Sequence, residues 1–486
     1  MTSLGVEPAD PAALRLPAGS LLLHIGPPKT GTTTVQGAFH AGRAAVLAQG
    51  VRYVGRSRHS GSGVLAVTRR PSFHRDSGPP PIRKWQELVR EVQAADEPRL
   101  VLSSEFFADA QPPAIEEIVA DLGRDRVHVV VTLRPLASIL PSQWQQYVQS
   151  FMSLGYPEWL DGVFNRERGA VTPTFWGRHR HDELVERWAS AVGPRNVTVV
   201  VIDESDHEHV LRVFESLLGL RAGTLGASDD ATNRSMTLPE IEAVRAFNIR
   251  FRAAGLGNAL YHRVMHFGAA AYMKWRRPPS DERRIETPAW ALERALQVER
   301  EMTAAIGASG ARVLGDLAAL AVPPKAGAPG AAGEAVCIPP AIATRMSLGI
   351  AVVAGLERGR LGDRPSLDRF ATYQLMGAIV ARWASGGLAL LRRFSRRPGG
   401  TRPTVAAVPQ DADCIEPDVV ASMAMDALLA TGIVRVVSAS GKGGAPQLRR
   451  VRWTWIEPPD VATATTRELA GTILRRLLRL RARSAE

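Results

Sequence analysis

The sequence is poor in cysteine, with only Cys337 and Cys414 among its 486 residues. Two cysteines cannot build a disulfide framework, and their scarcity favours a reducing compartment. No apolar run reaches the roughly 18–20 residues that span a bilayer, because Arg382 interrupts the nearest candidate at residues 373–391. The N-terminus also lacks a basic segment followed by an apolar stretch and a small-residue cleavage site. We therefore expect a soluble, cytoplasmic protein.

The charge of the chain is unbalanced, with 60 Lys and Arg against 48 Asp and Glu, a net charge of +12. Such an excess raises the local concentration of anionic ligands such as nucleotides, nucleic acids or acidic lipids, and composition does not choose among them. Hydrophobic residues make up 45% of the chain, which is enough to build a core and excludes disorder throughout. The length predicts two or three domains if a domain takes about 150 residues.

Short apolar runs alternate with helix-like segments in the first half of the chain. The predicted strands cover residues 21–25, 99–103, 127–133 and 196–202. The predicted helices cover residues 35–47, 82–92, 115–122, 184–192 and 210–218. Strands that are apolar on both faces and alternate with helices indicate an α/β fold, with a parallel sheet flanked by helices. The loops that follow the strands then share one edge of the sheet, where such folds bind ligands.

A stretch rich in Pro, Gly and Ala at residues 322–336 predicts a linker between two domains. We expect a tail at residues 1–19, an α/β domain at 20–321 and a C-terminal α+β extension at 337–486. Helical spacing continues within the first domain at residues 238–254 and 288–306. The extension has predicted helices at 347–356, 371–391 and 465–483, and predicted strands at 433–437 and 447–456.

The most informative segment is LLLHIGPPKTGTTT at residues 21–34, an apolar strand followed by a loop and the start of a helix. A helix N-terminus has backbone N–H groups without partners, and these bind phosphate or sulfate. Gly31 lets the backbone approach an anion closely, and Lys29 supplies a full charge. In ATP-binding loops of the form G-x-x-x-x-G-K-[ST] the lysine follows the second glycine. Here Lys29 precedes the glycine, which departs from the kinase pattern.

The segment PKTGTT at residues 28–33 resembles the P-loop-like phosphosulfate-binding loop of bacterial-type sulfotransferases that use 3′-phosphoadenosine-5′-phosphosulfate (PAPS). The resemblance covers roughly residues 21–250 and implies that Arg134 and Ser142, after the strand at 127–133, bind the 3′-phosphate. Arginine suits this role because its fork of donors grips phosphate oxygens. Ser138 is an alternative to Ser142 at a different offset. The residues expected to bind the co-substrate are Lys29, Thr30, Gly31, Thr32, Thr33, Thr34, Arg134 and Ser142.

A catalytic base is expected where the strand at 99–103 ends, at Glu105. Two phenylalanines follow it, and desolvation by them would raise the pKa of a carboxylate. Sulfotransferases that act on glycans often carry a glutamate there, although a carboxylate at a strand end can also pair with a basic neighbour. His24 is the second candidate, with a buried core histidine as its alternative reading. We expect His179 and His181 to be solvated or to line the substrate site.

The resemblance implies direct, in-line transfer of a sulfuryl group from PAPS to a hydroxyl or amine of a glycan, glycolipid or secondary metabolite. Lys29 would stabilise the leaving phosphate of the product 3′-phosphoadenosine-5′-phosphate (PAP), and no metal is expected. An ATP-dependent small-molecule kinase and a non-catalytic nucleotide-binding scaffold remain as alternatives. Arginines in the last turns of a helix usually complement its dipole, so we do not expect nucleic-acid binding. The basic helix at 465–483 would suit contact with a membrane surface if the acceptor were a lipid.

Overall fold

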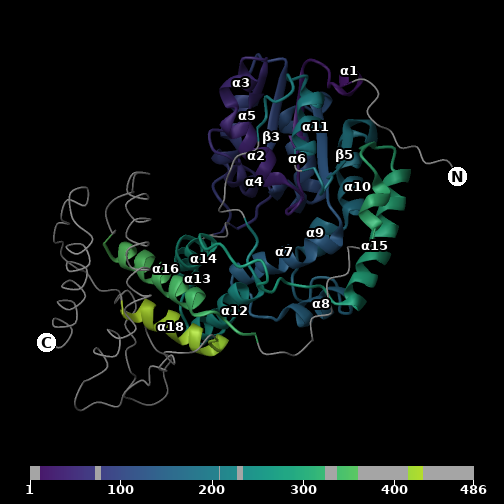
Figure 1. Ribbon diagram of the computed structural model, residues 1–486. Coiled ribbons are helices and arrows are strands. Elements are labelled where there is room, and N and C mark those ends of the chain that lie inside the picture. Colours follow the sequence, from purple (N-terminus) through teal and green to yellow (C-terminus); the bar gives the residue numbers. More distant parts are fainter. Residues whose placement is uncertain are drawn as a thin grey trace, which may run out of the picture. The chain divides into compact units, whose positions relative to one another are not determined.

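The computed structural model describes residues 11–71, 78–206, 208–226, 234–322, 336–359 and 414–430. The chain divides into two compact units (Figure 1). The first comprises Met1–Tyr147, Leu154–Asp230 and Ile285–Ala332, and the second comprises Val148–Ser153, Ala231–Arg284 and Gly333–Glu486. The segment Ala231–Arg284, which lies inside the predicted domain at residues 20–321, groups with Gly333–Glu486 in this division.

The first unit is built on one six-stranded sheet with the order β2-β3-β1-β4-β5-β6. Its strands are β1 Ser20–His24, β2 Val51–Tyr53, β3 Arg99–Ser103, β4 Val127–Leu133, β5 Val197–Val201 and β6 Arg312–Leu314. Every neighbouring pair is parallel, so all the strands end at the same edge. The predicted α/β fold with a parallel sheet is confirmed. The central strand β1 lies between β3 and β4, which places the loop after β1 next to the loops after both neighbours.

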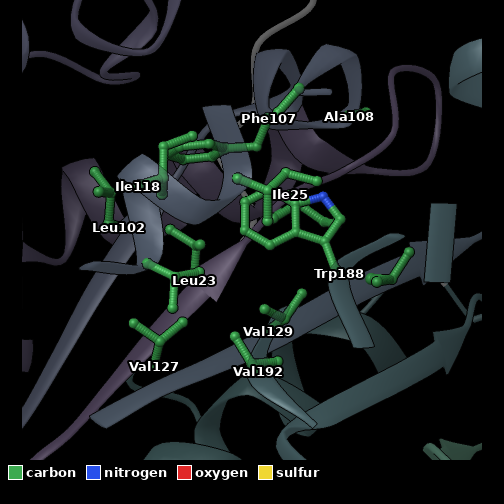
Figure 2. Close-up of a cluster of buried hydrophobic side chains, with 14 of the residues drawn as sticks. Leu23, Ile25, Leu102, Phe107, Ala108, Ile118, Val127, Val129, Trp188 and Val192 are labelled. Carbon is green, nitrogen blue, oxygen red and sulfur yellow. The ribbon is translucent and has the colours of Figure 1, made fainter. Parts of the chain in front are cut away.

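One face of the sheet is covered by α5 Arg83–Gln93, α6 Pro112–Leu122, α10 His181–Val192 and α15 Ala289–Ala308. Leu23 and Val129 point to this face and share a buried cluster with Trp188 of α10 (Figure 2). These side chains share a face because successive residues of a strand point to opposite sides. Truncating a buried leucine of this kind to alanine typically costs about 2–5 kcal/mol.

The opposite face is covered by α2 Thr32–Ala41, α3 Arg43–Leu47 and α11 His209–Leu218. Leu22 and Val130 point to this side and pack with Phe39 of α2 and Phe214 of α11. Both faces of the sheet are therefore buried, which is why the strands read as continuous apolar runs.

Most of the remaining elements of the first unit connect the strands, while α1 precedes β1 and η6 follows β6. Its other helices are α1 Pro11–Leu14, α4 Gly61–Val67, α7 Leu136–Gln149, α8 Tyr156–Phe164 and α9 Phe175–His179. Its 3-10 turns are η1 Glu105–Asp109, η2 Arg124–Arg126, η3 Pro194–Asn196 and η6 Leu317–Ala321. The predicted helix at 35–47 is broken in two at Gly42, where an added Cβ would lie 3.1 Å from the Ala38 carbonyl oxygen.

The second unit is helical where the structure describes it. Its elements are α12 Leu238–Ala253, α13 Asn258–His262, the π-helical turn η5 Arg263–Ala269, α14 Ala270–Lys274, α16 Pro340–Gly359 and α18 Pro417–Ala430. Gly268 of η5 and Gly349 of α16 cross closely, since a Cβ added at Gly268 would lie 2.6 Å from the Gly349 carbonyl oxygen. The predicted helix at 347–356 is part of α16. The predicted elements at 371–391, 433–437, 447–456 and 465–483, and the core of the linker, lie outside the described residues.

Cys337 and Cys414 form a disulfide, with their Cα atoms 5.2 Å apart, beside the antiparallel bridge between Ile338 and Ile415. The sequence did not suggest this pairing. Disulfides are rare in reduced compartments, so the pairing does not support the expectation drawn from the low cysteine count. Among the described residues, no helix is both long enough and apolar enough to cross a membrane.

Candidate functional site

The loop between β1 and α2 has an anion-binding geometry. Lys29 and Gly31 both adopt positive φ angles, 71° and 76°, and such turns aim successive N–H groups into a concavity. The N–H groups of Thr34 and Val35 already bond to the Gly31 carbonyl oxygen. The N–H groups that precede them, at the start of α2, have no acceptor within the helix. They are therefore available to phosphate or sulfate oxygens.

The hydroxyl of Thr30, predicted to contact the ligand, instead holds the loop in place. It is buried, donates to the Pro27 carbonyl oxygen at 2.6 Å and lies 2.8 Å from the Thr132 hydroxyl of β4. Only the backbone of Thr30 remains available to an anion. The role of its side chain is to fix the positive-φ turn, which a non-glycine residue such as Lys29 adopts only under structural constraint.

Two glycines allow this loop to pack closely against the residues that follow neighbouring strands. A Cβ added at Gly26 would lie 3.0 Å from the Glu105 Cα, and one added at Gly31 would lie 3.1 Å from the Ile202 Cδ1. Both glycines have positive φ angles, so only glycine combines the turn with this close approach. The loop thus lies between the residues that follow β3 and β5, and Glu105 lies beside it as the sequence predicts.

Glu105 is half-buried at the start of η1. Its Oε2 accepts a hydrogen bond from the Gln36 Nε2 of α2 at 3.0 Å. In the described part of the chain its partner is thus an amide, not the basic residue of the alternative reading. The charge of Glu105 adds to the effect of burial, which raises the pKa of Tyr53 above its ordinary range. The carboxylate therefore lies at the sheet edge within electrostatic reach of the Arg178 guanidinium, which is itself paired with Asp109.

His24 has the geometry of a core histidine. It is fully buried, with Nδ1 2.8 Å from the Ser103 hydroxyl and Nε2 3.2 Å from the Thr132 hydroxyl. Burial lowers its pKa to about 3, so it is neutral in the folded protein. Because both ring nitrogens are engaged away from solvent, the geometry favours the structural reading of His24 over the predicted role as a base.

Arg134 follows β4 and forms an ion pair with Glu204, in the loop after β5. The Ser138 hydroxyl of α7 donates to the other carboxylate oxygen of Glu204 at 3.1 Å. The predicted ligand Ser142 instead donates to the Ile139 carbonyl oxygen at 2.9 Å, within its own helix. Arg134 and Ser138 thus converge on one carboxylate, whereas the Ser142 hydroxyl bonds within its own helix.

A buried ion pair connects η1 to α9. Arg178 donates two hydrogen bonds of 2.6 Å to the carboxylate of Asp109, and both side chains are buried. Arg70 lies 3.6 Å from the same carboxylate. Because Glu105 and Asp109 share η1, this pair fixes the turn that carries Glu105. No local pattern in the chain indicates this pair, since the partners are 69 residues apart.

His179 and His181 are fully buried, which corrects the expectation that they are solvated. Their rings are 6.1 Å apart, and none of their ring nitrogens has a hydrogen-bond partner among the described residues. Burial lowers the pKa of His179 well below its usual value, and the charges of His181, Arg178 and Lys29 lower it further. His179 therefore lies within electrostatic reach of the loop lysine. Burial also lowers the pKa of His181 to about 4.

The described residues contain no group of three or more His, Cys, Asp or Glu side chains arranged to hold a metal ion. What they do contain is a turn with two positive φ angles before α2, a carboxylate beside it, and an arginine after the adjacent strand β4. Comparison of the chain with models of protein families, with curated proteins and with solved structures finds no match. The function must therefore be argued from the chemistry of these residues.

Proposed function

We propose that the chain is a sulfotransferase that uses PAPS. The observation that carries the proposal is the presence of two anion-binding positions on adjacent strands of one sheet edge. One is the loop after β1, with Lys29 ahead of Gly31, and the other is the pair Arg134 and Ser138 after β4. PAPS is a nucleotide that carries anionic groups at both its 5′ and 3′ positions.

The reaction assigns a role to each part of the site. The N–H groups of residues 30–33 bind the 5′-phosphosulfate, and Arg134 and Ser138 bind the 3′-phosphate. The acceptor oxygen attacks sulfur while the bond from sulfur to the bridging phosphate oxygen breaks. Lys29 stabilises the charge that develops on the departing phosphate of PAP, and Glu105 takes the proton of the acceptor hydroxyl.

The unused hydrogen-bonding capacity of His179 suits a hydroxyl acceptor. Burial and the charges of Arg178 and Lys29 keep its imidazole uncharged, and its nitrogens have unused hydrogen-bonding capacity. A hydroxyl supplies both a donor and an acceptor, and so matches a neutral imidazole with both nitrogens unpaired among the described residues.

The test is calorimetric titration of the protein with PAP, ADP and ATP, with and without Mg²⁺. A sulfotransferase binds PAP more tightly than ADP, because only PAP reaches the second position. A preference for ATP with Mg²⁺ would contradict the proposal and support a kinase. The variant Arg134→Ala should lose the preference for PAP. Arg126→Ala is a matched control, because Arg126 precedes the same strand and bonds to the Gly19 carbonyl oxygen at its opposite end.

The second arm of the test measures PAP formation from PAPS in the presence of simple alcohols and methyl glycosides. Turnover that depends on the added alcohol is the expected result. A protein that binds PAP tightly and transfers sulfate to none of these acceptors would favour the scaffold alternative.

A further inference from the structure

Three separate elements meet at Glu204. Arg134 comes from the residue after β4, Ser138 from the first turn of α7, and Glu204 from the loop after β5. Each oxygen of the Glu204 carboxylate takes one of the two donors. This arrangement imitates the way two donors bind two oxygens of a phosphate.

The contact is exposed enough to be exchanged for a ligand. The side chains of Arg134 and Glu204 are 35% and 42% exposed. Ion pairs of this kind contribute about 0–1 kcal/mol to stability, so little free energy holds the carboxylate in place. A phosphate monoester carries more charge than a carboxylate and offers three acceptor oxygens, so it binds the same donors more strongly.

We propose that Glu204 is an internal competitor for the 3′-phosphate: it occupies Arg134 and Ser138 in the empty protein and leaves them when the nucleotide binds. The inference rests on the proposed function, because it takes this position to be the 3′-phosphate site. Its consequence is that Glu204 weakens the binding of any nucleotide with a 3′-phosphate and hastens release of the product PAP. Nucleotides without that phosphate leave Glu204 where it is.

The size of the effect follows from the stability of the internal contact. If the contact is worth about 1 kcal/mol, roughly five in six molecules hold Glu204 on Arg134, and the affinity for PAP falls about sixfold. Repulsion between the displaced carboxylate and the phosphate adds to this figure. Removing the charge at Glu204 should therefore strengthen PAP binding roughly five- to tenfold.

An alternative role for Glu204 predicts that it strengthens nucleotide binding instead of weakening it. In many nucleotide-binding sheets a carboxylate near this edge accepts a hydrogen bond from a ribose hydroxyl. Under that reading the loss of the charge would weaken ADP, whose 3′-hydroxyl is free, and would give no gain for PAP.

The experiment compares Glu204→Gln with the wild-type protein by titration with PAP and ADP, and by stopped-flow dissociation of PAP. Glu208→Gln is the matched control, because it removes the same charge from an exposed position four residues away. We expect Glu204→Gln to bind PAP roughly five- to tenfold more tightly and release it more slowly, with ADP unchanged. The control should match the wild-type protein within twofold.

Three outcomes decide the matter. Unchanged PAP affinity in Glu204→Gln, in a protein where Arg134→Ala weakens PAP, overturns the competitor role and leaves the proposed function intact. Weaker ADP binding in Glu204→Gln also overturns it, in favour of a ribose contact. Equal affinity of the wild-type protein for PAP and ADP contradicts the proposed function. In that case the competitor role survives only if Glu204→Gln alone creates a preference for PAP.

Discussion

Each unit of the protein buries a cluster of polar side chains, and the two clusters differ in how well their hydrogen bonds are satisfied. In the second unit, Glu240 is fully buried and accepts hydrogen bonds from Arg234 and Arg276. Its carboxylate also caps α12 by accepting from the Thr237 N–H at 3.0 Å. Arg276 in addition pairs with Glu282, so this cluster is closed by its own members.

The first unit presents the opposite case at the edge of its sheet. His179 and His181 are equally buried, yet their ring nitrogens have no partner among the described residues. An unsatisfied buried polar group typically costs about 1–3 kcal/mol, so it persists where something outweighs the loss. The satisfied cluster therefore contributes to stability, and the proposed function assigns the unsatisfied histidines to the acceptor site.

The largest effect should come from breaking the satisfied cluster. Glu240→Gln leaves Arg234 and Arg276 with one charged partner fewer in a buried place, which typically costs about 3–5 kcal/mol. Hydrogen exchange of α12, followed by mass spectrometry, should show the loss, while the affinity for PAP stays unchanged. The exposed Asp281→Asn should alter stability by less than about 0.5 kcal/mol. If the amides of α12 were equally protected from hydrogen exchange in Glu240→Gln and in the wild-type protein, Glu240 would not have this structural role.

The next largest effect is expected in the first unit, at Lys29 in the loop after β1. Lys29→Ala removes a charge aimed at the departing phosphate, and the loss of one such preorganised group typically lowers kcat about 10²–10³-fold. PAP formation from PAPS measures the change, with Lys84→Ala as a control at an exposed lysine paired to Glu87. The affinity for PAP should change less than kcat does. A kcat within twofold of the wild-type value would show that Lys29 has no part in the chemistry.

The strands that the sequence predicted correctly, β1, β3, β4 and β5, have five to seven residues that are almost all buried. The strands β2 and β6 have only three residues each, too few for alternation to be recognised. They form because β2 pairs with β3 and β6 pairs with β5 at the two edges of the sheet. This pairing depends on the tertiary structure and not on the local sequence. The break at Gly42 likewise depends on a close backbone approach that spacing does not reveal.

The site was predictable where it is local in the chain. The loop at residues 26–34 and the positions of Glu105 and Arg134 follow from strand ends alone, because all parallel strands end at one edge. Partners distant in the sequence were not predictable. Nothing in the local pattern links Asp109 to Arg178 or Glu204 to Arg134, and the choice of Ser138 over Ser142 depends on where the loop after β5 lies.

Glu299 is a buried carboxylate with only one of its two oxygens hydrogen-bonded among the described residues. It is therefore intermediate between the satisfied cluster and the unsatisfied histidines. Its Oε1 accepts from the Leu136 N–H at the start of α7, while its Oε2 is buried without a partner among the described residues. Burial raises its pKa to about 8, and the charge of Asp182 adds to the rise. The folded state therefore holds a proton that the unfolded chain releases near pH 4.5.

This contribution to stability is fully present below pH 4.5 and is lost as the pH rises to about 8. Glu299→Gln removes it, so the variant should gain on the wild-type protein as the pH rises, by up to about 1.4 kcal/mol per pH unit. Urea unfolding of both proteins at pH 5, 6, 7 and 8 measures the difference. Glu293→Gln, exposed on the same helix, should show no such trend. A constant difference across this range would mean that Glu299 is ionised in the folded protein.

The smallest effects are expected for the two buried histidines without hydrogen-bond partners among the described residues, and they distinguish the role of one from that of the other. Replacing an unsatisfied buried polar side chain with an apolar one is close to neutral, so His179→Leu and His181→Leu should each change the stability by less than about 1 kcal/mol. Only His179 lies within electrostatic reach of Lys29 and Arg178, since the charge that acts on His181 is that of Asp182.

His179→Leu should therefore lower kcat/KM for an alcohol acceptor about tenfold, the worth of one hydrogen bond, without changing the affinity for PAP. His181→Leu should leave kcat/KM within twofold of the wild-type value. The two variants are matched in burial and chemistry, so a common loss of activity would reflect packing rather than acceptor binding. A loss confined to His181→Leu would reverse the assignment and move the acceptor away from the loop lysine.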